Sequence, residues 1–209
     1  MVFFLKLRLM IQDYFRERIF LVALVLILFF MGSVFGVLAA GILEPAQREH
    51  LLSYLNQGLH GEVFISNSLY TRQTIIANIK TVFFLFFMGI SVIGVPLALL
   101  LIFTRGFVLG YSISFLLRTM GFKGFVLVLT GVMPHNLVII PALFLMVIAI
   151  IDFAAVLTKI RFTKKQVMIG AELVKCAVLT LTVLVAMICA GFIQGYLTPL
   201  LTSWLTRII

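Results

Sequence analysis

The sequence contains apolar stretches that are too long and too free of charge for a water-soluble domain. From Ile19 to Leu43 there are 25 successive residues without a charged side chain, and from Thr81 to Thr104 there are 24. A helix needs about 20 apolar residues to cross the hydrocarbon of a bilayer. In the whole chain 63% of residues are hydrophobic and 11% are charged, whereas soluble domains carry about 25% charged residues. The chain is therefore predicted to be an integral membrane protein.

Five spans are predicted, and the expected fold class is all-α, a polytopic helical membrane bundle. The spans are assigned to residues 19–43, 81–104, 105–122, 124–158 and 177–199. The apolar run between Arg105 and Arg118 is short, and it reaches full length because these side chains can extend toward the two membrane surfaces. The fourth span contains Pro134 and Pro141. It is expected to be broken at Pro134, since proline removes a helical hydrogen bond; in an alternative, residues 124–133 form a re-entrant arm.

The distribution of charge predicts which ends of the spans face the cytoplasm. Residues 1–18 carry a net charge of +2 and residues 159–175 carry +4, whereas residues 44–79 carry −1. Basic residues favour the cytoplasmic side of a membrane. The N-terminus and the basic loop 159–175 are therefore predicted to be cytoplasmic, and the loop 44–79 and the C-terminus extracytoplasmic. The net charge of +9 is explained by this topology, and no nucleic-acid partner is expected.

The N-terminal residues 1–18 have apolar and polar side chains on opposite sides of a helical wheel. Such a helix can lie on the cytoplasmic leaflet of the bilayer, although the segment can also be a simple charged leader to the first span. The apolar run that follows is too long for the 7–15 residues of a signal-peptide core. The first span is therefore predicted to be retained.

The extracytoplasmic loop 44–79 is predicted to contain an amphipathic helix. It begins at Glu44-Pro45, and its apolar residues recur with helical spacing on one face at Leu51, Leu52, Leu55 and Leu59. This face is a candidate docking surface for a partner protein. The alternative is an amphipathic connector that rests on the membrane.

Catalytic and metal-binding signatures are absent from the sequence. His50 and His60, with Glu49 and Glu62 beside them, match no zinc-ligand spacing. No Gly-x-Ser-x-Gly, His-Glu-x-x-His or phosphate-binding glycine loop occurs. We therefore predict no catalytic residue, no metal and no cofactor, and the protein is not expected to be an enzyme. Asp152 is an acidic residue within a span, and either Lys159, two helical turns later, or water at the lipid boundary is expected to satisfy its charge.

His135 and Asn136 follow directly after Pro134. A proline inside a membrane helix frees backbone groups that must find new hydrogen-bond partners. The leading interpretation is that His135 and Asn136 supply these partners. A further bend in the same span is expected at Pro141. The alternative is a proton or ligand site, since ionisable groups inside membranes are often functional.

Pairs of glycines four residues apart occur in three of the predicted spans: Gly32 and Gly36, Gly106 and Gly110, and Gly191 and Gly195. Small residues with this spacing allow two membrane helices to approach closely. Packing within the bundle is the leading interpretation, and an interface between two copies in a homodimer is the alternative.

Several segments of the chain resemble the stage II sporulation protein M (SpoIIM) family. They lie in the same order and at the same spacing along nearly the whole chain, at Ile90–Pro96, Arg105–Gly110, Gly121–Phe125, Met133–Ala142 and Tyr196–Leu201. At position 135, members of this family vary, and the His found here favours a hydrogen-bonding role over a catalytic one.

The resemblance implies a multipass membrane protein on the mother-cell side of the sporulation septum. Proteins of this family act there with peptidoglycan-degrading membrane proteins of the SpoIID and SpoIIP type. The implied function is a membrane scaffold that recruits or stabilises these enzymes, so that the mother-cell membrane migrates around the forespore. A small membrane transporter or channel subunit is the alternative, because a broken helix with polar residues near the midplane is typical of transport sites.

Overall fold

The protein is helical throughout the part of the chain that the structure describes. The computed structural model describes residues 18–59, 67–89, 91, 93–163 and 169–201, and these residues contain no β-strand. The all-α fold class predicted from the sequence is confirmed. Apart from Arg18, the predicted amphipathic segment 1–18 lies outside the described residues. The helices are α2 (Ile19–Gly41), α3 (Pro45–Leu59), α4 (Asn67–Gly89), α5 (Gly94–Met120), α6 (Phe122–Leu127), α7 (Met133–Thr163) and α8 (Ile169–Phe192), with π-helical segments η1 (Val128–Val132) and η2 (Ile193–Leu197).

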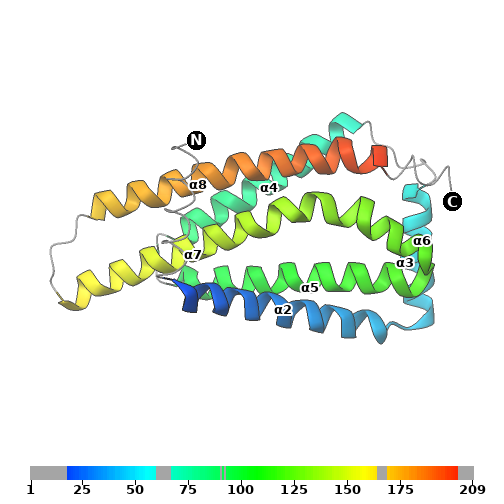
Figure 1. The fold of residues 1–209 in the computed structure, drawn as a ribbon, viewed down its shortest axis with the longest axis horizontal. Helices are drawn as coiled ribbons and strands as arrows, with labels where there is room; N and C mark the ends of the chain where they lie inside the picture. The colour runs from blue at the N-terminus through cyan, green and yellow to red at the C-terminus, as the bar shows by residue number, and fades with distance from the viewer. Residues whose placement is uncertain (1–17, 60–66, 90, 92, 164–168, 202–209) are drawn as a thin grey trace, which may run out of the picture.

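Most of the helices run along the long axis of the molecule, and α3 lies across one end (Figure 1). We call this end the α3 end; the turn between α5 and α6 also lies there. The start of α2, which directly follows Arg18, the end of α7 and the start of α8 lie toward the other end, which we call the Arg18 end. The chain passes from the Arg18 end to the α3 end in α2, α5 and α8, and returns in α4 and α7.

Four helical stretches are long and apolar enough to cross a membrane: Ile19–Gly41, Gly94–Met120, Phe122–Thr158 and Leu173–Leu201. They support the predicted polytopic membrane bundle. Helix α4 runs beside them, but its first half is polar, with Arg72 and Gln73 among its residues, so that its average hydropathy is lower.

The predicted span 81–104 is wrong, because the chain reverses direction within it. Helix α4 ends at Gly89 and α5 begins at Gly94. Between them the Ser91 N–H donates to the Met88 carbonyl at 3.1 Å, and the Gly94 N–H donates to the Ser91 carbonyl at 2.9 Å. A Cβ on Gly94 would collide with the Met88 backbone. Pro96 falls in the first turn of α5, where the missing N–H has no helical acceptor to lose.

Three further predicted segments have other boundaries in the structure. The predicted separate span 105–122 is the second part of α5, and Arg105 lies inside this helix rather than at a span end. Residues 67–79, expected in the extracytoplasmic loop, belong to α4 and line the bundle. The predicted loop 159–175 is largely helical, because α7 continues to Thr163 and α8 starts at Ile169; residues 164–168 lie outside the described residues.

Helices α2 and α5 lie side by side and parallel, with their backbones in direct contact. Added Cβ atoms would collide with backbone carbonyls of the partner helix: at Gly32 and Gly36 with those of Phe103 and Phe107, and at Gly106 and Gly110 with those of Phe29 and Ser33. The two glycine pairs thus face each other within one chain. Close approach of this kind increases van der Waals contact, which drives helix association in lipid, where the hydrophobic effect is absent.

Helices α4 and α8 form a second close pair, which is antiparallel. Gly191 faces Ile75, and Gly195 faces Thr71. Asn78 is 5% exposed, and its Nδ2 donates to the Met187 carbonyl at 3.0 Å. Gly191 of α8 and Gly195 of η2 therefore make room for the half-polar helix α4, and a buried amide joins α4 to α8.

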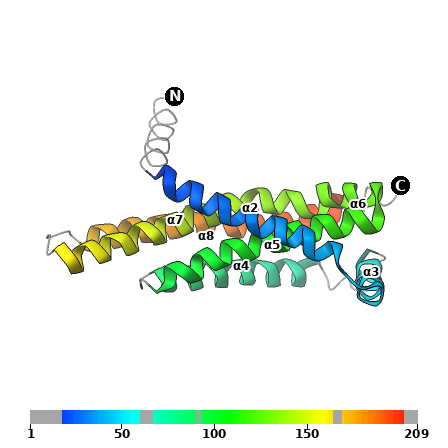
Figure 2. The same ribbon diagram turned by 90° about the horizontal axis from the view of Figure 1, so that it is seen from below.

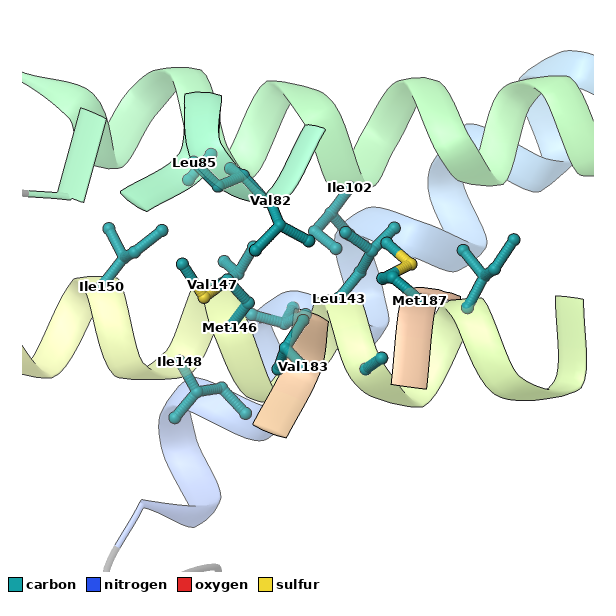
Figure 3. Packing of buried hydrophobic residues seen from close by; sticks show 14 of the residues in the cluster. Val82, Leu85, Ile102, Leu143, Met146, Val147, Ile148, Ile150, Val183 and Met187 are labelled. Atoms are coloured by element: carbon teal, nitrogen blue, oxygen red, sulfur yellow. The ribbon is translucent and has the colours of Figure 1, made fainter. Parts of the chain in front are cut away.

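Helix α7 occupies the middle of the bundle and is in contact with α2, α4, α5 and α8. Leu143, Met146, Val147 and Ile150 are at most 1% exposed. Figure 3 shows them among side chains from the surrounding helices: Val82, Leu85, Ile102, Val183 and Met187. A helix that is apolar all round needs such a central position. The outward faces of the surrounding helices are also apolar, as shown by Phe30, Leu181 and Val185, each more than half exposed, and these faces suit contact with lipid.

An ion pair joins the start of α2 to α7 near the Arg18 end. The Arg18 guanidinium donates from Nε to Oδ2 of Asp152. The two side chains are 27% and 24% exposed. Asp152 therefore pairs with Arg18, 134 residues away in the sequence; the side chain of Lys159, an expected partner, lies outside the described residues.

Replacing Asp152 with Asn is expected to lower the free energy of unfolding by roughly 1–3 kcal/mol. This estimate lies between the 0–1 kcal/mol of exposed pairs and the 3–5 kcal/mol lost when one partner of a buried pair is removed. Thermal unfolding in detergent micelles of the Asp152→Asn, Arg18→Gln and double variants measures it. The double variant should lose less than the sum of the two single variants, and strict additivity would contradict a direct interaction.

Candidate functional site

Helix α3 is the element least attached to the rest of the bundle. It lies beyond the last turn of α2 (Figure 2), and it makes no extensive contact with any other described helix. Its tether is Arg48, whose Nη2 donates to the Arg118 carbonyl of α5 at 2.7 Å. A short helix that makes few contacts with the other described helices presents much of its surface for binding.

The candidate docking residues lie on this helix. Leu51 and Leu52 are half-buried, and the side chains of Leu55 and Leu59 lie outside the described residues. Tyr54 is 62% exposed, and its ring meets that of His50 edge-on, with 4.9 Å between centroids. An exposed aromatic residue next to half-buried leucines is typical of the centre of a protein–protein interface.

Of the two histidines and two glutamates considered as metal ligands, His50 and Glu49 lie in the described part of α3. His50 contacts Tyr54, and Glu49 is exposed. His60 and Glu62 lie outside the described residues. Within the described ranges, no three His, Cys, Asp or Glu side chains come together as metal ligands would.

The expected break at Pro134 is absent, and a π-helical turn takes its place. Helix α6 continues through η1 into α7, with the Met133 N–H donating to the Val128 carbonyl, five residues earlier. Pro134 cannot donate to Thr130 and its ring crowds the carbonyl four residues back. The wider π-turn accommodates this defect without interrupting the helix. Pro141 lies inside α7, which arches along its length (Figure 1).

Asn136 and His135 are joined by a short chain of hydrogen bonds at this turn. Nδ2 of Asn136 donates to the Val132 carbonyl at 2.8 Å, as expected for repair of a disturbed helix. The same amide nitrogen lies 3.2 Å from Nε2 of His135. Because an amide NH₂ group only donates, Nε2 accepts, and the proton of the neutral ring is on Nδ1. This Nδ1 is buried and has no hydrogen-bond partner in the described part of the protein.

Arg105 brings a positive charge close to His135. It is the twelfth residue of α5, about 16 Å from the start of the helix at 1.5 Å per residue, and it is half-buried. Its guanidinium acts electrostatically on the His135 ring. The interior of the bundle therefore holds a buried N–H donor on His135 and a half-buried guanidinium on Arg105.

Arg105 was not predicted to lie near His135, because the charge pattern of the sequence places Arg105 at a span boundary. Gly106 and Gly110 could have indicated the position of Arg105. A pair of glycines four residues apart is typical of the interior of a helix that packs against another helix, so the neighbouring Arg105 is not expected at a helix end. The buried Asn78 and Thr71 were missed as well, because they were assigned to a solvent-exposed loop.

Taken together, the helices and their apolar outer faces define a polytopic helical membrane protein. The model of the stage II sporulation protein M family matches residues 25–199. The chain belongs to this family, and membership implies a sporulation-related membrane protein. No curated protein and no solved structure matches the chain.

Proposed function

We propose that the protein is a non-enzymatic scaffold for engulfment. In this proposal it lies in the mother-cell membrane at the sporulation septum. There it recruits or stabilises peptidoglycan-degrading membrane proteins of the SpoIID and SpoIIP type, so that the membrane can migrate around the forespore. Membership of the SpoIIM family supports the sporulation context.

The observation that carries the proposal is the position of α3. This helix lies across the end of the bundle, with Tyr54 exposed and a hydrogen bond to α5 through Arg48. The charge pattern favours an extracytoplasmic α3 end, because residues 159–175 at the Arg18 end carry a net charge of +4. On that side of the membrane α3 faces the cell wall, where wall-degrading enzymes work.

The experiment is purification of the tagged chain from membranes of sporulating cells. We expect peptidoglycan-degrading membrane proteins to be recovered with it, and septal membranes to stay flat when the gene is deleted. A matched control is another tagged multipass protein of the same membrane. Normal engulfment in the deletion strain would contradict the scaffold function.

A second candidate function, a transporter or channel subunit, is favoured by one observation. Arg105 and His135 place donors near the middle of the bundle, where polar groups often form a solute or proton path. Gln at position 135 keeps a donor and an acceptor but cannot titrate.

For His135→Gln we therefore expect normal engulfment and normal protein levels, because the role of the ring is hydrogen bonding to Asn136. His135→Leu, which has no acceptor, should lower the melting temperature in detergent by a few degrees. Loss of engulfment in the Gln variant, at normal protein levels, would favour the transporter.

A further inference from the structure

A small pocket lies at the α3 end, between the helices that meet there. It has a volume of about 290 Å³ and is lined by Ala40 and Gly41 at the end of α2, by Leu43 beyond it, by Arg48 of α3, and by Phe115, Arg118 and Thr119 of α5. Two guanidinium groups thus share one pocket, and no carboxylate is among the residues that line it.

Both arginines are held in place by protein groups that use only part of their donor capacity. Nη2 of Arg48 donates to the Arg118 carbonyl at 2.7 Å, and Nε of Arg118 donates to Oγ of Ser114 at 3.1 Å. A guanidinium has five N–H donors, so each arginine keeps several for a ligand. The Arg118 guanidinium also lies over Gly41, where Nη2 would be 3.4 Å from an added Cβ.

The negative partial charges at the C-terminal ends of two helices balance only part of the positive charge of the two arginines. The C-terminal ends of α2 and α5 meet here, and each contributes about half a negative charge. Two arginines carry two full positive charges, so a net charge of roughly +1 remains at the pocket. A bound anion would neutralise it, and the fork shape of guanidinium suits the oxygens of a phosphate group.

The surroundings of the pocket indicate where this phosphate comes from. Leu38 and Ile42, which adjoin the pocket in the sequence, are 59% and 84% exposed, and they continue the apolar outer face of α2. The pocket lies at the end of the apolar part of the bundle, where hydrocarbon gives way to headgroups. A phospholipid matches both features, because it joins a charged phosphate to acyl chains.

We propose that the Arg48–Arg118 pocket binds the phosphate group of an anionic phospholipid, whose acyl chains lie along the exposed face of α2. The lipid would hold α3 against the end of the bundle. This binding site does not depend on the scaffold function, since it requires only this chain and the membrane.

The test is native mass spectrometry of the purified protein after incubation with phosphatidylglycerol or phosphatidylcholine. We expect one tightly retained phosphatidylglycerol molecule on the wild-type chain, and at least tenfold weaker retention by Arg48→Gln and by Arg118→Gln. Arg48 is exposed on α3, so its substitution leaves the fold of the bundle intact. Lys123→Gln is the matched control: it removes a charge at the same end from a residue that does not line the pocket, and it should retain the lipid.

A second arm distinguishes a lipid from soluble phosphate. Protein in phosphatidylcholine nanodiscs is melted with and without inorganic phosphate, and compared with protein in nanodiscs that contain phosphatidylglycerol. Only phosphatidylglycerol should raise the melting temperature, and only when both arginines are present. Equal stabilisation by inorganic phosphate, equal retention by the wild type and both arginine variants, or equal loss in Lys123→Gln would each overturn the proposal.

Discussion

Replacement of Gly36 by Leu should separate α2 from α5 and remove most of the folded protein from the membrane. A side chain at this position would collide with the Phe107 carbonyl and the Tyr111 backbone, and backbone atoms of two long helices cannot move aside as a flexible side chain can. Overpacking in a tightly packed core costs about 1–3 kcal/mol, and displacement of a whole helix places the loss at or above the upper end of this range.

Substitution of glycine by alanine is expected to lower stability at some positions of this chain and to leave it unchanged or raise it at others, which serve as controls. Gly36→Ala and Gly106→Ala should both destabilise, whereas Gly131→Ala and Gly170→Ala add a methyl group where no atom lies within 4 Å. Alanine is the better helix former by about 0.5–1 kcal/mol, so these two variants should be neutral or slightly stabilising. Melting temperatures in detergent and steady-state protein levels measure the difference. Equal stability of Gly36→Ala and Gly131→Ala would contradict the contact between α2 and α5.

Replacement of Leu51, Leu52 and Leu55 by Ser should abolish partner recruitment and leave the amount of protein unchanged. These leucines form the predicted apolar face of α3, a helix with few contacts to the bundle, so the core is not affected. Loss of three apolar anchors from an interface removes several kcal/mol of binding free energy, at more than about 1 kcal/mol for each important residue.

The matched controls for the leucine variant are Ser53→Ala and Glu49→Gln, exposed positions on the same helix. Both should recruit partners normally. The readouts are septal localisation of fluorescently labelled wall-degrading enzymes and the fraction of cells that complete engulfment. Unchanged localisation in the triple leucine variant would show that α3 is not the docking surface.

Much of the fold could be predicted from local sequence, because apolar length and glycine spacing act within single helices. The long uncharged run that begins at Ile19 and the glycine pairs predicted membrane helices with close contacts. The sequence did not reveal which pairs of glycines meet, since Gly36 and Phe107 are brought together only by the order in which the helices pack. The ion pair between Arg18 and Asp152 was missed for the same reason.

The predictions of helix boundaries were wrong at positions where two local sequence features indicate different structures. Proline inside a helix usually breaks or kinks it, but at Pro134 one π-turn accommodates the proline and the helix continues. Near Gly94 the apolar run continues without a charge, so hydropathy alone does not indicate that the chain reverses direction between α4 and α5. Hydrogen bonds around Ser91 form this reversal. Arg105 appeared to mark a span end, yet its half-buried side chain lies inside α5.

The measurement that tests the scaffold function most directly is site-specific photo-crosslinking in sporulating cells. A photoreactive residue in place of Tyr54 on α3 should form covalent products with peptidoglycan-degrading membrane proteins. The same residue in place of Ile93, which is 79% exposed at the Arg18 end, should form none. Products from position 93 but not from position 54, in cells that complete engulfment, would contradict recruitment through α3.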